Sequence, residues 1–133
     1  MYRLFAIFVL LSSTVLAADV PRLTPTEAAK RVEQGLAVLV DVREPSEWHQ
    51  TGVAAPAVLL PKSDFDAGMI GDWKAFMEQV GEKQIILYCR SGRRSGTVAA
   101  ALAAQGHPVA NAGSFKDWEA AQLPTRQLGS DKR

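Results

Sequence analysis

Short apolar runs recur along the chain and are separated by polar, turn-forming segments. The runs at residues 37–41, 57–60 and 84–88 show no polar alternation, which is typical of strands covered on both faces of a sheet. A further short strand is expected at residues 107–110, directly after a glycine. These segments predict a small, buried sheet.

Helical patterns fill the intervals between the expected strands. Thr24, Pro25 and Glu27 form the signature of a capped helix start, and Gly35 marks that helix's end. Strands that alternate with helices indicate an α/β fold with a central, mostly parallel sheet and helices on both faces. The polar tail from Thr125 is expected to fray. Helices are expected at residues 24–34, 73–80, 93–105 and 114–121, with a brief helical turn at 44–48.

The first residues have the layout of a secretory signal peptide. Arg3 precedes an apolar run, and small residues follow up to Ala17 and Ala18, the expected cleavage positions. The alternative, a membrane anchor, is disfavoured because a spanning helix needs about 20 apolar residues. We therefore expect an exported protein, periplasmic in a Gram-negative bacterium, without stable membrane association after cleavage. The expected parts are a leader at 1–18, one domain at 19–126 and a polar tail at 127–133.

Charge is balanced over the chain but uneven along it. The sequence has 15 basic and 14 acidic residues, so no global field favours nucleic acid. No acidic residue lies between Glu82 and Asp117, and basic residues in or beside that window surround Cys89, the only cysteine. A single cysteine has no partner in the chain and excludes a cysteine-based zinc cluster, and we expect neither a metal nor a cofactor. The thiol is therefore either buried and inert or retained for its reactivity.

Cys89 ends the predicted strand at 84–88 and precedes a loop rich in arginine. Where a strand leads through such a loop to a helix N-terminus, main-chain amides and cations form an anion site. Both lower the pKa of a thiol from about 8.5 and favour the nucleophilic thiolate. The alternative is a structural cysteine beside solvated arginines. We predict Cys89 as the nucleophile and the following residues as the anion site: Arg90, Ser91, Gly92, Arg93, Arg94 and Ser95.

Three segments carry a family resemblance. Residues 89–95, Cys-Arg-Ser-Gly-Arg-Arg-Ser, resemble the active-site loop of rhodanese-like sulfurtransferases. Residues 41–48 are similar to the family's first signature, and residues 111–118 with Leu123-Pro124 are similar to its C-terminal signature. The matches stand in family order and imply a rhodanese-like fold over most of the chain. They resemble the small, exported, single-domain members of the phage-shock-protein E type.

The resemblance implies thiosulfate sulfurtransferase chemistry. The Cys89 thiolate would attack the outer sulfur of thiosulfate, or of another sulfane-sulfur donor, and would hold a persulfide after sulfite leaves. Cyanide or a thiol acceptor would then take the sulfur in ping-pong catalysis. Arg94 is the first choice for a direct oxyanion contact and Arg90 the second. With no surplus apolar face in the sequence, a monomer is expected.

Two other classes of function stay open. The first is a non-catalytic binding module that uses this fold to recognise a partner or an oxyanion. The second is a cysteine phosphatase, which the loop length disfavours. Such phosphatases have five residues between cysteine and arginine, whereas four separate Cys89 from Arg94, and Ser95 takes the phosphatase position. A phosphatase also needs an acid for its leaving group, and the sequence identifies none.

Asp41 and Arg43 follow the strand at 37–41, so we expect them at the same sheet edge as Cys89. They would orient the cysteine loop from outside it, form a structural ion pair or cap the turn at Pro45; a structural role is favoured. The chain departs from the family pattern after Gly52, where the usual histidine is replaced by Val53. This departure is expected to change loop shape and acceptor preference more than the cysteine chemistry.

Overall fold

The computed structural model describes Val9 and residues 19–129. The expected leader, apart from Val9, and residues 130–133 lie outside the described residues, so the signal peptide and its cleavage stay predictions. Within the part of the chain that the structure describes, no helix is both long and apolar enough to cross a membrane.

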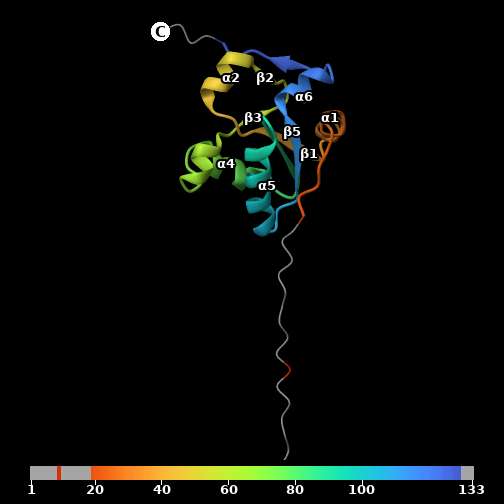
Figure 1. Ribbon diagram of the computed structural model, residues 1–133. Helices are drawn as coiled ribbons and strands as arrows, with labels where there is room; N and C mark the ends of the chain where they lie inside the picture. The colour runs from red at the N-terminus through yellow and green to blue at the C-terminus, as the bar shows by residue number, and fades with distance from the viewer. Residues whose placement is uncertain (1–8, 10–18, 130–133) are drawn as a thin grey trace, which may run out of the picture.

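A four-stranded parallel sheet forms the centre of the molecule (Figure 1). It confirms the predicted sheet, although β3 is shorter than expected and β5 runs on to residue 114. Arg22, ahead of the first helix, forms an isolated parallel bridge with Asn111 of β5. The spatial order is β3-β1-β4-β5, for the strands β1 (Ala37–Asp41), β3 (Val58–Leu59), β4 (Gln84–Cys89) and β5 (Val109–Ser114).

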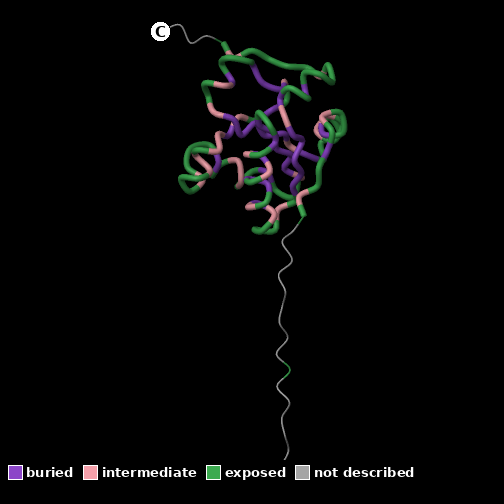
Figure 2. Tube along the Cα trace, viewed as in Figure 1, coloured by how far each residue is buried: buried purple, intermediate pink, exposed green. Residues whose placement is uncertain are grey.

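Helices cover both faces of the sheet, as the alternating pattern predicts. On one face, Leu39 and Ile86 pack in a cluster with Trp118 of α6. On the other face, Val40 and Leu87 pack in a cluster that includes side chains of α4 and α5. Buried residues therefore concentrate along the central strands (Figure 2). The helices are α1 (Pro25–Glu33) and α6 (Phe115–Ala120) on the first face, and α4 (Asp72–Gln79) and α5 (Arg93–Ala104) on the second.

The α1 start confirms the capping signature. Thr24 Oγ1 accepts from the Glu27 amide at 3.1 Å, and Glu27 Oε2 accepts from the Thr24 amide at 3.4 Å. The expected turn at 44–48 is a full helix, α2 (Pro45–Thr51), and the sequence pattern missed the five-residue α3 (Lys62–Asp66). Both helices lie between strands and leave the order of the sheet unchanged.

The expectation of fraying is wrong for the first two residues of the tail, Thr125 and Arg126. Strand β6 (Thr125–Arg126) pairs antiparallel with β2 (Val53–Ala54) in a separate two-stranded sheet. The Arg126 side chain reinforces the pair, because it donates to the carbonyl of Ala55 at 3.2 Å and to that of Ala57 at 2.9 Å. The end of the domain is therefore fastened to the segment that follows α2.

Candidate active site

Parallel strands place their carboxyl ends at one edge of the sheet, and the candidate site lies there. Asp41 ends β1 and Cys89 ends β4, with Asp41 opposite Tyr88 in the strand register. One extra residue in β5 shifts its register beyond Leu87, so that Ser114 stands opposite Cys89. The structure thus brings Cys89, Asp41 and Ser114, the N-cap of α6, to the same edge.

The loop after Cys89 turns its amides toward the sulfur. The Gly92 amide donates to Cys89 Sγ at 3.0 Å. Gly92 has φ +88°, a left-handed conformation that favours glycine, and a Cβ there would lie 3.2 Å from Cα of Gly113. Gly92 is also the residue from which α5 begins, so the sulfur faces the N-terminus of that helix.

These contacts make the thiol more acidic despite its burial. Burial raises the pKa of Cys89, but the Ser95 hydroxyl and the amides of Ser95, Ser91 and Gly92 outweigh it and lower the pKa below its ordinary value. Cys89 has no exposed surface. Cys89 differs from an inert core cysteine because hydrogen-bond donors point at its sulfur.

The structure gives the three loop arginines different surroundings. Both terminal nitrogens of Arg94 donate to the Glu47 carboxylate of α2, at 2.6 and 2.8 Å. The first choice for an oxyanion contact is therefore already paired within the protein. Arg90 and Arg93 are exposed, and Arg90 lines the cavity beside the loop.

Asp41 and Arg43 form a buried ion pair, 2.9 Å between Nη2 and Oδ2. Arg43 also donates to Thr51 Oγ1 at 2.9 Å and to the Gly52 carbonyl at 2.8 Å. Its guanidinium carbon lies 4.4 Å from the ring centre of Phe115, a cation–π distance. The pair joins β1, the end of α2 and the start of α6, as a structural ion pair does.

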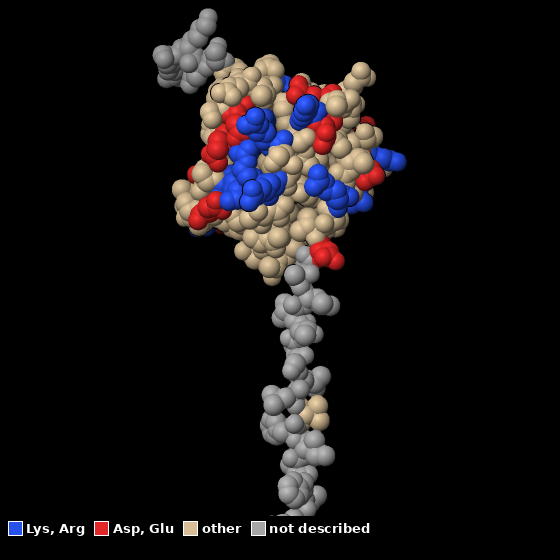
Figure 3. Space-filling model, viewed as in Figure 1, with Lys and Arg blue, Asp and Glu red and all other residues tan. Residues whose placement is uncertain are grey.

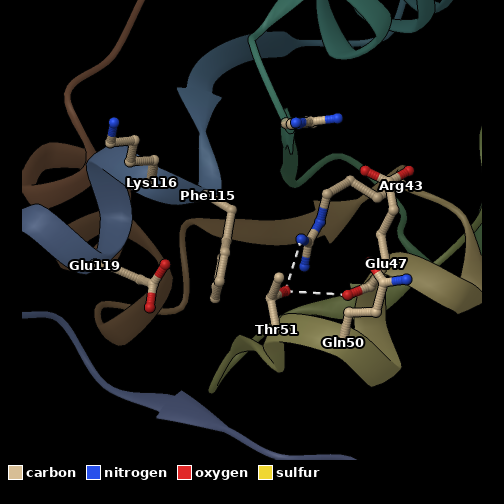
Figure 4. A pocket seen from close by; sticks show the side chains of 8 residues that line it. Arg43, Glu47, Gln50, Thr51, Phe115, Lys116 and Glu119 are labelled. Carbon is tan, nitrogen blue, oxygen red and sulfur yellow. Dashed lines mark hydrogen bonds between the residues drawn. The ribbon is translucent and has the colours of Figure 1, made fainter.

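A cavity of about 540 Å³ opens beside the cysteine loop. In Figure 4, the Arg43 side chain reaches toward Phe115 and Thr51, and Lys116 and Glu119 lie on the far side of the phenyl ring. The wall of the cavity combines cations with carboxylates, so the cavity suits a small ligand that carries charge. The lining residues are Arg43, Glu47, Gln50, Thr51, Arg90, Phe115, Lys116 and Glu119.

Basic side chains also gather on the face seen in Figure 3, between the levels of α2 and α5, with acidic side chains beside them. The Glu47–Arg94 pair joins those two helices. Within the described residues, no group of three or more His, Cys, Asp or Glu side chains could hold a metal ion.

Sequence reasoning missed three residues around the loop. Glu47 lies inside the first family signature, yet its partner Arg94 is distant in sequence. Arg22 lies over the loop, because a Cβ on Gly92 would come within 3.4 Å of its Nη2. Asn111 is buried, and its side chain binds the loop at the Gly92 carbonyl, 2.9 Å away. The available signals for Asn111 were its place at the start of the C-terminal signature and a polar residue after an apolar run.

A family model described as the rhodanese-like domain matches residues 24–121. The chain therefore belongs to the rhodanese-like family, which confirms both the resemblance of the three signatures and the predicted α/β fold.

Individual relatives agree with this assignment. The chain is 35% identical over 89 residues to a thiosulfate:glutathione sulfurtransferase of Saccharomyces cerevisiae, covering 61% of this chain and 63% of that protein. It is 34% identical over 88 residues to a rhodanese domain-containing protein of Drosophila melanogaster, covering 60% and 79%. The chain thus spans less than two thirds of the yeast relative's length. A rhodanese-like domain protein from Staphylococcus aureus shares the fold, with a TM-score of 0.62, 22% identity, and coverage of 81% and 100%.

Proposed function

We propose that this protein is a thiosulfate sulfurtransferase that carries sulfane sulfur as a persulfide on Cys89. The observation that carries the proposal is the sulfur's place at the end of β4, with the Gly92 amide at 3.0 Å and the helix α5 starting beside it. The sulfurtransferase name of the yeast relative supports the same class of reaction. The four-residue spacing from Cys89 to Arg94 favours it over a cysteine phosphatase.

In the first half-reaction, the Cys89 thiolate attacks the outer sulfur of thiosulfate. A new S–S bond forms to Cys89, the S–S bond of thiosulfate breaks, and its electron pair leaves with sulfite. In the second half-reaction, an acceptor attacks the outer sulfur of the persulfide and the Cys89 thiolate leaves. The acceptor is cyanide or a thiol, and no external oxidant or reductant enters either step.

The charges of the site fit these steps. Amides aimed at the sulfur stabilise the thiolate before attack and the persulfide anion after it. Arg90 and Lys116 of the cavity favour a dianionic donor and the departing sulfite. Because Cys89 has no exposed surface and does not line the cavity, side chains around the loop must shift for thiosulfate to reach the sulfur.

A thiol acceptor is a natural partner for this cavity. A volume of about 540 Å³ exceeds the needs of cyanide and admits a small peptide-like thiol. The yeast relative is named for glutathione as its acceptor. We therefore propose a low-molecular-weight thiol as one acceptor and cyanide as another.

Mass spectrometry of the protein after exposure to thiosulfate tests the proposal. We expect a gain of about 32 mass units on Cys89, the mass of one sulfur atom, and its loss on addition of cyanide or a thiol. The variant Cys89→Ser should stay folded, gain no mass and produce no thiocyanate. Thiocyanate formation by folded Cys89→Ser at the wild-type rate would refute the assignment.

Export is a proposal of its own, based on the pattern of residues 1–18. Expressed in a Gram-negative host, the protein should appear in the periplasmic fraction with a mass that shows cleavage after Ala17 or Ala18. Retention of Met1 in a protein confined to the cytoplasm would contradict it.

A further inference from the structure

Asn111 of β5 binds the cysteine loop, the first turn of α5 and the end of its own strand. Its side-chain amide donates to the Gly92 carbonyl at 2.9 Å, and its Oδ1 accepts from the Gly113 amide at 3.0 Å. The same Oδ1 accepts from the Ser95 hydroxyl at 2.9 Å. Ser95 Oγ lies 3.4 Å from Cys89 Sγ, within hydrogen-bonding distance of sulfur. All five residues are buried.

The orientation of the Asn111 amide is fixed by its partners. A flipped amide would place two N–H donors together at Gly113 and two carbonyl acceptors together at Gly92. Oδ1 therefore faces Ser95, and the hydrogen between the two oxygens has to come from the Ser95 hydroxyl. Asn111 also packs tightly, since a Cβ on Gly96 would lie 3.2 Å from its Nδ2.

Ser95 carries one hydroxyl hydrogen but faces two acceptors, Asn111 Oδ1 and the sulfur. When Cys89 is a thiol, its S–H can donate to Ser95 Oγ while Ser95 donates to Asn111. When Cys89 is a thiolate, the sulfur has no hydrogen, and the Ser95 hydrogen binds it best. Asn111 then keeps only the Gly113 amide as a donor to its oxygen.

We propose that Asn111 is a positioning residue that competes with the sulfur of Cys89 for the single hydrogen of Ser95. The proposal rests on Cys89 as the nucleophile of the proposed function. The hydrogen bond to Asn111 holds the Ser95 hydroxyl within reach of the sulfur. The same bond opposes ionisation of Cys89, because the Ser95 hydrogen has to leave Asn111 before it can bind the thiolate. Asn111 thus sets how much of the thiol is ionised at a given pH.

Other charged or titratable groups lie on the elements around the sulfur, and a test has to separate their effects from that of Asn111. They come from the loop itself, from α2, from the ends of β1 and β4, from the segment before α1 and from α6. These groups are Arg90, Arg93, Arg94, Glu47, Asp41, Arg43, Tyr88, Arg22 and Asp117. They are the same in every variant below, so their contribution cancels in a cycle of substitutions.

The test is a double-mutant cycle of Asn111→Leu and Ser95→Ala, read as the pH profile of alkylation by iodoacetamide. Cys89 is the only cysteine, so the signal reports its thiolate alone. With Ser95 present, removal of the Asn111 oxygen leaves the sulfur without a competitor. Asn111→Leu also removes the contact with Gly92, and the effect of that loss is measured separately below. Relative to that effect, the thiolate fraction at fixed pH should be about two- to tenfold higher, which is the size of one neutral hydrogen bond.

Loss of the Gly92 contact is measured in the Ser95→Ala background, where no hydrogen can be released. The proposal requires that Asn111→Leu shift the profile differently in the two backgrounds, toward lower pH when Ser95 is present. Equal shifts would overturn it and leave Asn111 a purely structural residue. Asn111→Ala removes the same oxygen without added bulk and replaces Asn111→Leu if that variant does not fold. Because alkylation needs no thiosulfate, failure of sulfur transfer and failure of this proposal are separate results.

Discussion

Two arginine–carboxylate pairs lie near the cysteine loop, and they differ in burial. The side chains of Arg43 and Asp41 are 3% and 0% exposed. Those of Arg94 and Glu47 are 32% and 23% exposed. The first pair joins elements on the wall of the cavity, whereas the second joins α2 to the start of α5, next to the sulfur.

The difference in burial separates a structural contribution from a chemical one. A buried charge is stable only when its partner and its hydrogen bonds are complete, and Arg43 contacts Asp41, Thr51, the Gly52 carbonyl and the Phe115 ring. The partly exposed pair contributes little to folding because water can replace either partner. The Arg94 charge is still coupled to the sulfur, since the pKa of Arg94 is raised first by its hydrogen bonds to Glu47 and in part by the charge of the Cys89 thiolate.

The largest effect should come from the buried pair. Asp41→Asn removes the charge that balances Arg43 and should lower the free energy of unfolding by about 3–5 kcal/mol. Urea denaturation measures the loss. The matched control is Glu47→Gln, which should lose less than about 1 kcal/mol. Similar losses for the two variants would remove the distinction drawn between the pairs.

An intermediate effect should appear in the acidity of the thiol. Arg94→Gln removes a cation coupled to the sulfur and leaves Glu47 unpaired, so the pKa of Cys89 should rise. Glu47→Gln should shift it in the opposite direction, by less. Alkylation rates between pH 5 and 10 measure both, and Lys30→Gln on the exposed part of α1 is the control. Shifts of the same sign would show that the charges of this pair do not reach the sulfur.

The smallest effect should appear in acid. The hydrogen bonds from Arg94 lower the pKa of Glu47 below its ordinary value of 4.5 in the folded protein. A carboxyl group whose pKa is lowered by folding stabilises the fold at pH values above its pKa in the unfolded chain. This stabilisation is lost as the pH falls through the pKa of the folded state. Wild type should therefore exceed Glu47→Gln in unfolding free energy at pH 6, with the difference shrinking below pH 4.5. A constant difference from pH 6 to pH 3 would contradict the assignment.

The sequence predicts the central part of this molecule well because the signals there are local. An apolar run, one glycine and an alanine-rich helix predict the strand, loop and helix around Cys89. The β2–β6 pair was missed because two-residue strands carry no periodic pattern. The pairing of Arg94 with Glu47 was missed because it depends on how α2 packs against α5, which no local pattern encodes. Asn111 shows the same limit, since its partners are set by the register shift in β5.

The β2–β6 pair has a practical consequence for anyone who alters the end of the chain. The segment that β6 holds in place follows Gly52, whose carbonyl accepts from Arg43. A truncation before Thr125, or a rigid fusion partner attached there, would remove the strand that holds this segment. The Gly52 carbonyl that binds Arg43 would then be less well positioned, although the cysteine loop itself is unchanged. An affinity tag belongs beyond residue 129, on a flexible linker.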